Sequence, residues 1–227
     1  PFDSTMLACT PHQVYRSGNG DKEWEPVLST KKTDFRSIVF STKYPGTCWA
    51  SGNKLFKSKD YGKTWVDISD KVFAHLKQRA IQTVTRIALC EDPNNAERLV
   101  AFYSASHEAY VQESWDGGAT WKVLYKNHYV KRADVHHTDI AIAPGNSNTI
   151  LLGTYRAYLS KDNGNTFEEV TQPIYEHPQF AHDDIRGLYM KSSSEFFLAT
   201  DVGVFRSIDT AHTWQNVSGK GLTAMQI

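Results

Sequence analysis

The stretch Ser-Lys-Asp-Tyr-Gly-Lys-Thr-Trp at residues 58–65 decides the fold, because its pattern returns three more times along the chain. The returns are Ser-Trp-Asp-Gly-Gly-Ala-Thr-Trp at 114–121, Ser-Lys-Asp-Asn-Gly-Asn-Thr-Phe at 160–167 and Ser-Ile-Asp-Thr-Ala-His-Thr-Trp at 207–214. A worn copy, Ser-Gly-Asn-Gly-Asp-Lys-Glu-Trp, occupies residues 17–24. The shared pattern is Ser-x-Asp-x-Gly-x-Thr-Trp.

Each copy predicts a tight turn between two strands. The glycine supplies a positive φ, and the aspartate accepts hydrogen bonds from N–H groups of the turn. The aromatic residue then starts the outgoing strand and packs inward. We therefore predict a structural role for the aspartates and aromatics of the four clear copies: Asp60, Trp65, Asp116, Trp121, Asp162, Phe167, Asp209 and Trp214.

The pattern resembles the Asp-box, or BNR repeat, of sialidases, sortilin-type receptors and secreted BNR-repeat proteins similar to glycoside hydrolases. Four near-complete copies make the resemblance specific, and it covers nearly the whole chain. It implies a β-propeller in which each box joins the third and fourth strands of a blade. It also implies a place outside the cytoplasm, secreted or at the cell surface. In that family the boxes lie away from the ligand face, so they imply no activity by themselves.

The spacing of the copies agrees with a propeller. The box aromatics stand at residues 24, 65, 121, 167 and 214, and a period in the forties with four short strands is typical of propeller blades. We predict an all-β propeller of four-stranded antiparallel blades, with a short helix in an insertion at about 70–82 whose Phe73, Leu76 and Ala80 share one face. The five predicted repeats cover about residues 1–30, 31–70, 83–126, 136–172 and 182–227.

The two ends of the chain leave two explanations open. The first repeat begins at its second strand, residues 5–9, and residues 222–227 resemble the start of another innermost strand. Either this last strand completes the first blade and closes a five-bladed ring, or the repeats belong to a longer propeller with further parts of the chain beyond them. We favour the longer propeller, because members of the family that the boxes resemble usually have six or more blades.

Composition argues against two classes of protein. The 227 residues include 25 basic and 25 acidic side chains, so the formal net charge is zero and no basic excess points to nucleic acid. No apolar run is long enough to insert across a membrane. The three cysteines, Cys9, Cys48 and Cys90, lack metal-type spacing and allow at most one disulfide. We prefer the interpretation that all three are small buried thiols.

Candidate ligand-binding residues precede the predicted innermost strands, whose entry loops meet at the mouth of a propeller's central channel. His-Thr-Asp-Ile at 137–140 aligns with His-Asp-Asp-Ile at 182–185, one blade period of 45 residues later, and arginines stand at the starts of innermost strands. We expect these side chains to gather around one pore rim: His137, Asp139, His182, Asp184, Arg186, Arg36 and Arg86.

Two interpretations of these rim residues stay open. Arginines bind carboxylates or phosphates as a fork, and carboxylates with imidazoles hold cations, which favours a polar ligand or cation site. Alternatively, each aspartate caps a strand-entry turn and each histidine packs between blades. We prefer the structural interpretation because the motif repeats with the blade, and we predict no metal and no cofactor.

A catalytic site is not indicated by the sequence. Candidate carboxylates are Asp139, Asp184 and Asp201, but nothing pairs them as a glycosidase requires. Thr-Asp-Val-Gly at 200–203 resembles the Thr-Asp-x-Gly segment of xyloglucan-cleaving propellers, a segment also common in non-catalytic blades. Phe-Arg-Ser-Ile at 35–38 resembles the arginine motif of sialidases only faintly, since it lacks the proline.

The sequence therefore predicts a non-catalytic extracellular or cell-surface module that binds a glycan or a protein partner. The first alternative is a glycoside hydrolase of sialidase or xyloglucanase type with its site at the pore rim. The second is a sorting receptor ectodomain like sortilin, which the scarcity of cysteines disfavours. Trp115 replaces a small polar residue of the box, and we prefer packing on the next blade over a role as an exposed platform for a sugar ring.

Overall fold

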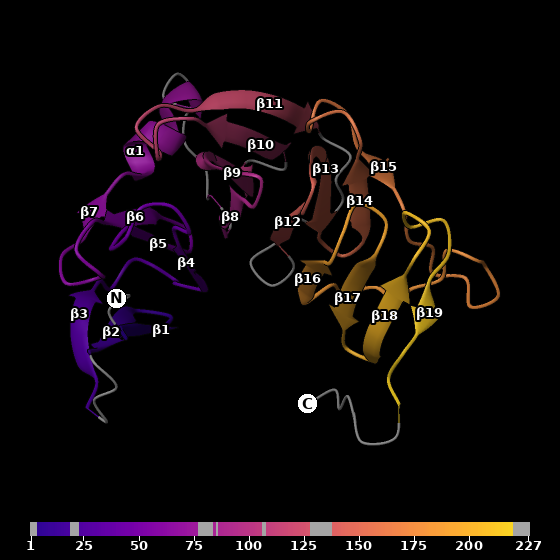
Figure 1. The fold of residues 1–227 in the computed structure, drawn as a ribbon, viewed down its shortest axis with the longest axis horizontal. Helices are drawn as coiled ribbons and strands as arrows, with labels where there is room; N and C mark the ends of the chain where they lie inside the picture. The colour runs from indigo at the N-terminus through magenta and orange to yellow at the C-terminus, as the bar shows by residue number, and fades with distance from the viewer. Residues whose placement is uncertain are drawn as a thin grey trace.

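The computed structural model describes residues 4–18, 23–76, 84, 86–105, 108–127 and 138–219. These residues form five antiparallel sheets, one of three strands and four of four strands, arranged as the blades of an open arc (Figure 1). The predicted all-β propeller is confirmed. Within each sheet the strands follow chain order from the inside of the arc to the outside, because every strand pairs with its neighbour in sequence.

The first two blades differ in strand number. Among the described residues, blade 1 has three strands: β1 (Met6–Thr10), β2 (Gln13–Ser17) and β3 (Glu25–Ser29). Its first strand corresponds to the second strand of a complete blade, as the sequence predicts, because the worn box follows β2. Blade 2 has all four: β4 (Ser37–Phe40), β5 (Cys48–Ser51), β6 (Leu55–Ser58) and β7 (Val66–Asp67).

Blades 3 to 5 are also four-stranded. Blade 3 has the longest strands: β8 (Ala88–Asp92), β9 (Asn95–Ala105), β10 (Glu108–Ser114) and β11 (Lys122–Asn127). Blade 4 contains β12 (Asp139–Ala143), β13 (Asn146–Gly153), β14 (Ala157–Ser160) and β15 (Glu168–Glu169). Blade 5 contains β16 (Gly187–Met190), β17 (Phe196–Thr200), β18 (Gly203–Ser207) and β19 (Gln215–Asn216).

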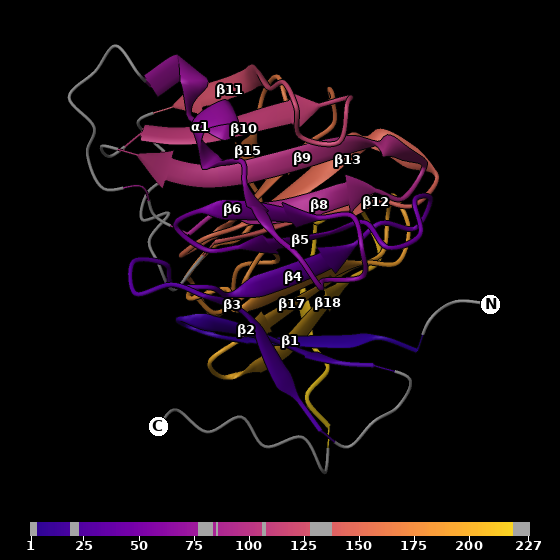
Figure 2. The same ribbon diagram turned by 90° about the vertical axis from the view of Figure 1, so that its left-hand side faces the viewer.

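The innermost strands β4, β8, β12 and β16 contact one another in this order along the inside of the arc, with β1 next to β4 (Figure 1). Each innermost strand starts on the side of the arc that we call the rim face and ends on the side that we call the box face. The box turns lie on the box face because they follow the third strand of each blade. In the side view, the end of β9 and α1 project on the rim face (Figure 2).

The hydrophobic core lies between blades and not within them. Four clusters of buried apolar side chains each join two neighbouring sheets. In the cluster between blades 4 and 5, for example, Leu151 and Leu159 pack against Phe196, Leu198 and other residues of blade 5. Alternate residues of each strand point to opposite faces, so every inner sheet is apolar on both sides.

The box aromatics pack against the preceding blade. Trp65 joins the cluster between blades 1 and 2, Trp121 the next one, Phe167 the next and Trp214 the last. Trp24, which follows the worn box of blade 1, is 43% exposed and has no described sheet before it. The inward packing predicted for the box aromatic is therefore the contact that joins one blade to the next.

The polar residues of the four boxes make the same hydrogen bonds. The serine Oγ donates to the aspartate Oδ1 over 2.8 Å in all four. The threonine Oγ1 donates to the aspartate Oδ2 over 2.6–2.7 Å, and its N–H donates to Oδ1. Glycine has a positive φ in three boxes, as predicted, and Ala211 takes that place in the fourth.

The insertion between blades 2 and 3 contains the predicted helical segment in a shorter form. It begins with one helical turn, α1 (Ser69–Val72), followed by a 3-10 turn, η1 (Ala74–Leu76). Phe73 and Leu76 pack on the cluster between blades 2 and 3, whereas Ala80 lies outside the described residues. None of the described helices has the length and apolar character to cross a membrane. Cys9, Cys48 and Cys90 are free thiols.

Candidate binding site at the pore rim

Asp139 connects blades 4 and 5 at the rim. It is the first residue of β12, where its Oδ1 accepts the N–H of Ile140 over 2.9 Å. Its Oδ2 accepts the N–H of Leu188 in β16, also over 2.9 Å. Burial raises the pKa of Asp139, and these two hydrogen bonds and the charge of Arg86 oppose that rise. Both carboxylate oxygens are thus used to hold backbone groups of two neighbouring blades.

Arg86 lies close to several rim charges from other blades. Burial lowers the pKa of its guanidinium, and the charges of Asp139 and Asp34 act in the opposite direction. The positive charge of Arg36 also acts on Arg86, and both arginines act on the thiol of Cys9 in β1. The structure therefore brings residues of blades 1 to 4 within electrostatic reach of one another. The Nε of Arg86 is buried and has no hydrogen-bond partner among the described residues.

The other two rim arginines are held by carboxylates. Arg36 donates from Nε and Nη2 to Oδ2 of Asp34, over 3.0 and 2.8 Å. Arg186 forms a two-pronged pair with Asp201, over 2.6 and 3.1 Å. Such forked pairs fix both side chains in orientation. The Asp201 side chain, which the sequence singled out as a candidate carboxylate, is thus held against Arg186.

The three arginines do not hold equivalent positions. Arg36 and Arg186 each donate their N–H to the second strand of their own blade, to the oxygens of Ser51 and Ala199, over 2.8 Å. Arg86 precedes Ile87 and stands one position earlier in its blade than Arg186 does in blade 5. Neighbouring residues of an extended chain point to opposite sides. This offset explains why Arg86 is partly buried while Arg36 and Arg186 are exposed.

The recurrence of His and Asp at 45 residues does not mark equivalent positions, so this part of the sequence alignment is wrong. Asp139 pairs with Gly153 in blade 4, and the same register position of blade 5 pairs Gly187 with Ala199. Asp139 therefore corresponds to Gly187 and not to Asp184. The physical reason is the longer entry into β16, which places Asp184 three positions before Gly187, the start of that strand pairing.

Asp184 and His182 lie in that entry segment. Asp184 has a φ of +64°, and its N–H donates to the oxygen of Tyr155 over 2.9 Å. The Nδ1 of His182 lies 2.9 Å from the oxygen of Asp183, the next residue. His137 lies outside the described residues. Among the described residues, no group of three or more His, Cys, Asp and Glu side chains is arranged to hold a metal ion.

Two further rim residues were underrated by sequence reasoning. Asp34 holds Arg36, and Cys9 faces the charges of Arg36 and Arg86. Asp34 stands two residues before Arg36, which is the only local signal for this pair. Cys9 has no such signal, because the register that brings β1 beside β4 is a property of the arc. The described rim residues thus carry charges of both signs, and Arg36 and Arg186 are paired with carboxylates of their own blades.

Comparison with known proteins supports the propeller fold. No protein family model matches the chain, and the search of curated proteins found no match. Among solved structures, an ancestral GH74 enzyme has a TM-score of 0.73 at 13% identity, over 99% of this chain and 31% of that one. YCF48 from Cyanidioschyzon merolae has a TM-score of 0.62 at 15% identity, over 98% and 72% of the two chains.

A third solved structure, the nidogen/laminin complex, contains a chain with a TM-score of 0.61 at 9% identity, over 90% of this chain and 70% of that one. The chain thus spans about a third of the length of the GH74 enzyme. Identities this low show the fold alone, and the fold that these neighbours share with the chain is the β-propeller.

Proposed function

We propose that this chain is a non-catalytic propeller module that binds a partner, either a protein or a glycan, at its pore rim. The observation that carries the proposal is the engagement of Asp139, whose two oxygens accept the N–H groups of Ile140 and Leu188. A general acid or nucleophile needs a carboxylate that is free to reach a substrate. Asp139 instead serves as a bridge between two blades.

Arg86 is the rim group best suited to contact a partner. In the part of the chain that the structure describes, Arg86 forms no ion pair with a carboxylate, whereas Arg36 and Arg186 are forked onto Asp34 and Asp201. Its Nε is buried, so the exposed part of this half-buried guanidinium is what can bind a carboxylate or phosphate group. We therefore expect the partner to present an acidic group to the rim, such as the carboxylate of a peptide or of an acidic sugar.

The solved neighbours support partner binding without deciding its chemistry. One of them is YCF48 bound to D1 peptide, with a TM-score of 0.54 at 12% identity, and another is the nidogen/laminin complex. The GH74 enzymes among the neighbours support the alternative, a glycoside hydrolase, for which Asp201 is the candidate carboxylate in the Thr-Asp-Val-Gly segment. We further propose a place outside the cytoplasm, which fractionation of the source cell would test.

The binding module and the hydrolase are separated by one set of assays. The wild-type chain is applied to glycan and peptide arrays and, in parallel, incubated with xyloglucan and chromogenic glycosides. We expect binding without turnover, and weaker binding in Arg86→Ala. Arg206→Ala is the matched control, because Arg206 is paired with Glu195 in blade 5 and belongs to no rim contact described here.

Turnover that disappears in Asp201→Asn or Asp139→Asn would contradict the proposal and favour the hydrolase. Thermal unfolding of each variant shows whether a loss reflects misfolding. If Arg86→Ala binds the partner as tightly as the wild type does, the pore rim is not the binding site.

A further inference from the structure

A hollow of about 530 Å³ lies on the box face between blades 2 and 3, on the side of the molecule opposite the pore rim. Its walls come from the turn after β4, the end of β6, the start of β9 and the box of blade 3. A second hollow of about 430 Å³ shares Lys57, Lys59 and Gly117 with the first, and it continues along the outer edge of the molecule over β7 to Lys71 of α1, which projects on the rim face. We call the two together the box-face groove.

Two exposed aromatic side chains stand in this groove. Trp115 is 52% exposed and Tyr44 is 44% exposed. Trp115 does not pack on the next blade as preferred from the sequence. Instead its ring lies over the guanidinium of Arg98, at 5.7 Å. The phenol of Tyr44 donates to Oε1 of Glu97 over 3.2 Å. Arg98 thus supports the Trp115 ring, whereas Tyr44 is held at its phenol oxygen and has Lys43 Nζ over its ring at 5.4 Å.

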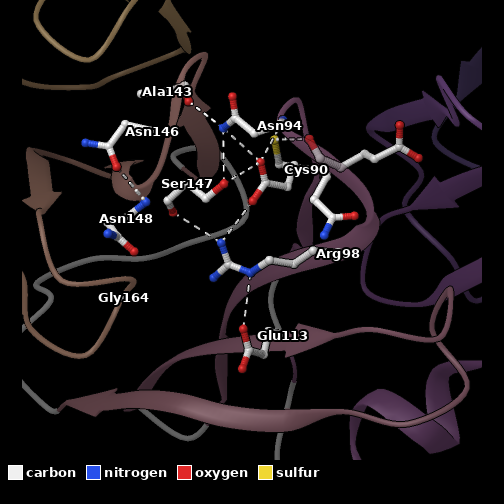
Figure 3. Close-up of polar contacts among 12 residues, drawn as sticks. Cys90, Asn94, Arg98, Glu113, Ala143, Asn146, Ser147, Asn148 and Gly164 are labelled. Atoms are coloured by element: carbon white, nitrogen blue, oxygen red, sulfur yellow. Dashed lines mark hydrogen bonds and ion pairs between the residues drawn. The ribbon is translucent and has the colours of Figure 1, made fainter.

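The support behind Trp115 is rigid. Arg98 is 1% exposed and is held by Glu113 of its own blade over 3.1 Å and by the oxygen of Ser147 in blade 4 over 3.2 Å (Figure 3). It also donates to Asp92 over 3.2 Å. A buried, multiply bonded guanidinium loses little further freedom when a ligand binds above it. The Trp115 platform is thus preorganised, which lowers the entropic cost of binding.

The charges of the groove leave an excess of positive charge. Glu97 is paired with Lys43 over 2.8 Å, and the charge of Asp116 acts on Lys57. Lys59 and Lys71, by contrast, form no ion pair in the part of the chain that the structure describes. An anionic ligand therefore meets uncompensated ammonium groups here.

Trp49 and Lys57 form part of the floor of the groove. Trp49 lines the first hollow but is almost fully buried, and its indole N–H is buried with it. Lys57 lies over the Trp49 ring at 5.5 Å and donates to the oxygen of Gly117 over 2.7 Å. These contacts hold the Lys57 ammonium group in place at the floor of the groove.

We propose that the box-face groove binds an acidic oligosaccharide, with a pyranose ring stacked on Trp115 and its carboxylates near Lys59 and Lys71. A sugar ring offers a flat, weakly apolar face to an indole, and its hydroxyls suit the short polar groups of the box. An extended peptide would gain main-chain hydrogen bonds mainly by adding a strand to β7. That strand, Val66–Asp67, is only two residues long, which disfavours a peptide. The site shares no residue with the pore rim.

The test uses tetragalacturonate as the probe and its methyl ester as the uncharged counterpart, with binding measured by isothermal titration calorimetry. We expect the acid to bind and the ester to bind more weakly. Trp115→Ala should raise the Kd about tenfold, and Lys59→Ala about two- to fivefold. Lys161→Ala and Ile208→Ala are the controls, because they change the same box positions in blades 4 and 5 and should leave the Kd unchanged.

Lys59→Ala keeps the test valid if Trp115→Ala disturbs Arg98, since Lys59 is exposed and supports no core contact. The proposal is overturned if tetragalacturonate does not bind, or if hexaglutamate binds more tightly than the sugar acid. It is also overturned if the Kd rises in Arg86→Ala but not in Lys59→Ala, because the sugar would then occupy the pore rim. That last outcome would support the proposal that the pore rim binds the partner and would contradict only the proposal of a sugar site in the box-face groove.

Discussion

At the scale of single residues, each box turn needs two successive residues with positive φ. The pairs are Tyr61 and Gly62, Gly117 and Gly118, Asn163 and Gly164, and Thr210 and Ala211. Only blade 5 fills both positions with residues that are neither Gly nor Asn, and Thr210 is β-branched at a φ of +61°. For such residues the left-handed region costs about 1–2 kcal/mol. The box hydrogen bonds of blade 5 hold this strained conformation in place.

Thr210→Asn should therefore stabilise the protein. Asn occupies the same position in blade 4 at a φ of +65°, and its side chain tolerates the left-handed region. We expect the free energy of unfolding to rise by about 0.5–1 kcal/mol, measured by urea denaturation. The reverse change in blade 4, Asn163→Thr, should lower it by a similar amount. Equal stability of both variants and the wild type would argue against strain at these positions.

The box aspartates should make stability depend on pH in the acid range. Burial alone would raise the pKa of these carboxyls, but hydrogen bonds from the box threonine and serine outweigh it. They hold the pKa of Asp60, Asp116 and Asp209 at about 2. In the unfolded chain the pKa of an aspartate is about 3.9, so the unfolded state binds protons first as the pH falls.

The contribution of these carboxyls to the free energy of unfolding should thus be constant above pH about 4. It should fall as the pH drops toward about 2. Urea denaturation between pH 5 and pH 2.5 measures this slope. Asp116→Asn removes one of the three groups, and its slope should be shallower than that of the wild type. If this variant does not change the slope, the Asp116 carboxyl has the same pKa in the folded and the unfolded state.

At the scale of elements, a buried polar network joins blades 3 and 4 on the box face. Arg98 of β9 contacts Asp92, Glu113 and the oxygen of Ser147, and Asn94 donates to the oxygen of Ala143 over 2.9 Å (Figure 3). Asp92 and Arg98 are both almost fully buried. A buried charge is tolerated when it is paired and hydrogen-bonded on several sides, as here.

Arg98→Ala should be strongly destabilising, because it leaves Asp92 and Glu113 buried without their cation. We expect a loss of about 3–5 kcal/mol in the free energy of unfolding, measured by urea denaturation. Arg206→Ala is the matched control, since Arg206 pairs with Glu195 over 2.6 Å but is only partly buried. Its loss should be about 0–1 kcal/mol. Similar losses of unfolding free energy in both variants would contradict the conclusion that the buried network stabilises the protein more than a partly exposed ion pair does.

Hydroxyl groups after the outermost strands form a second repeated element. The N–H that starts the third strand donates to Ser69 in blade 2, to Thr171 in blade 4 and to Ser218 in blade 5, over 3.0, 3.1 and 2.8 Å. Each hydroxyl follows an apolar residue in the sequence: Ile68, Val170 or Val217. The sequence contains this recurrence, but without the strand pairing nothing marks these hydroxyls as acceptors.

At the scale of the whole molecule, stability is shared between neighbouring blades because the core lies in their interfaces. Leu198 of blade 5 packs in one cluster with residues of blade 4. Leu198→Ala should lower the free energy of unfolding by about 2–5 kcal/mol. It should also speed hydrogen exchange in β12–β14 as well as in β16–β18, because repeat proteins couple nearest neighbours.

Ile208→Ala in the same blade is the control, since Ile208 is exposed and should cost little. Hydrogen exchange followed by mass spectrometry separates the two cases. Faster exchange confined to blade 5 in Leu198→Ala would mean that each sheet is stable by itself, contrary to the arrangement of the clusters.

The sequence by itself determined the features that repeat locally. Ser, Asp, Gly and Thr at fixed offsets close a turn through contacts within eight residues, so the boxes and the strand order follow from the pattern, as do the three strands that the described residues form in blade 1. The sequence predicted the placement of the box aromatics only in part. It predicted that these side chains pack inward, but not that they contact the preceding blade.

Only the tertiary structure decided the sites, because they join residues of different blades. Asp139 reaches Leu188, Arg98 reaches Ser147, and Trp115 lines the same hollow as Tyr44, and none of these pairs has a fixed separation in the sequence. A shift of three residues in the entry to β16 was enough to make Asp184 and Asp139 unequal. Strand register and the stacking of blades set these contacts, and both depend on packing across the whole arc.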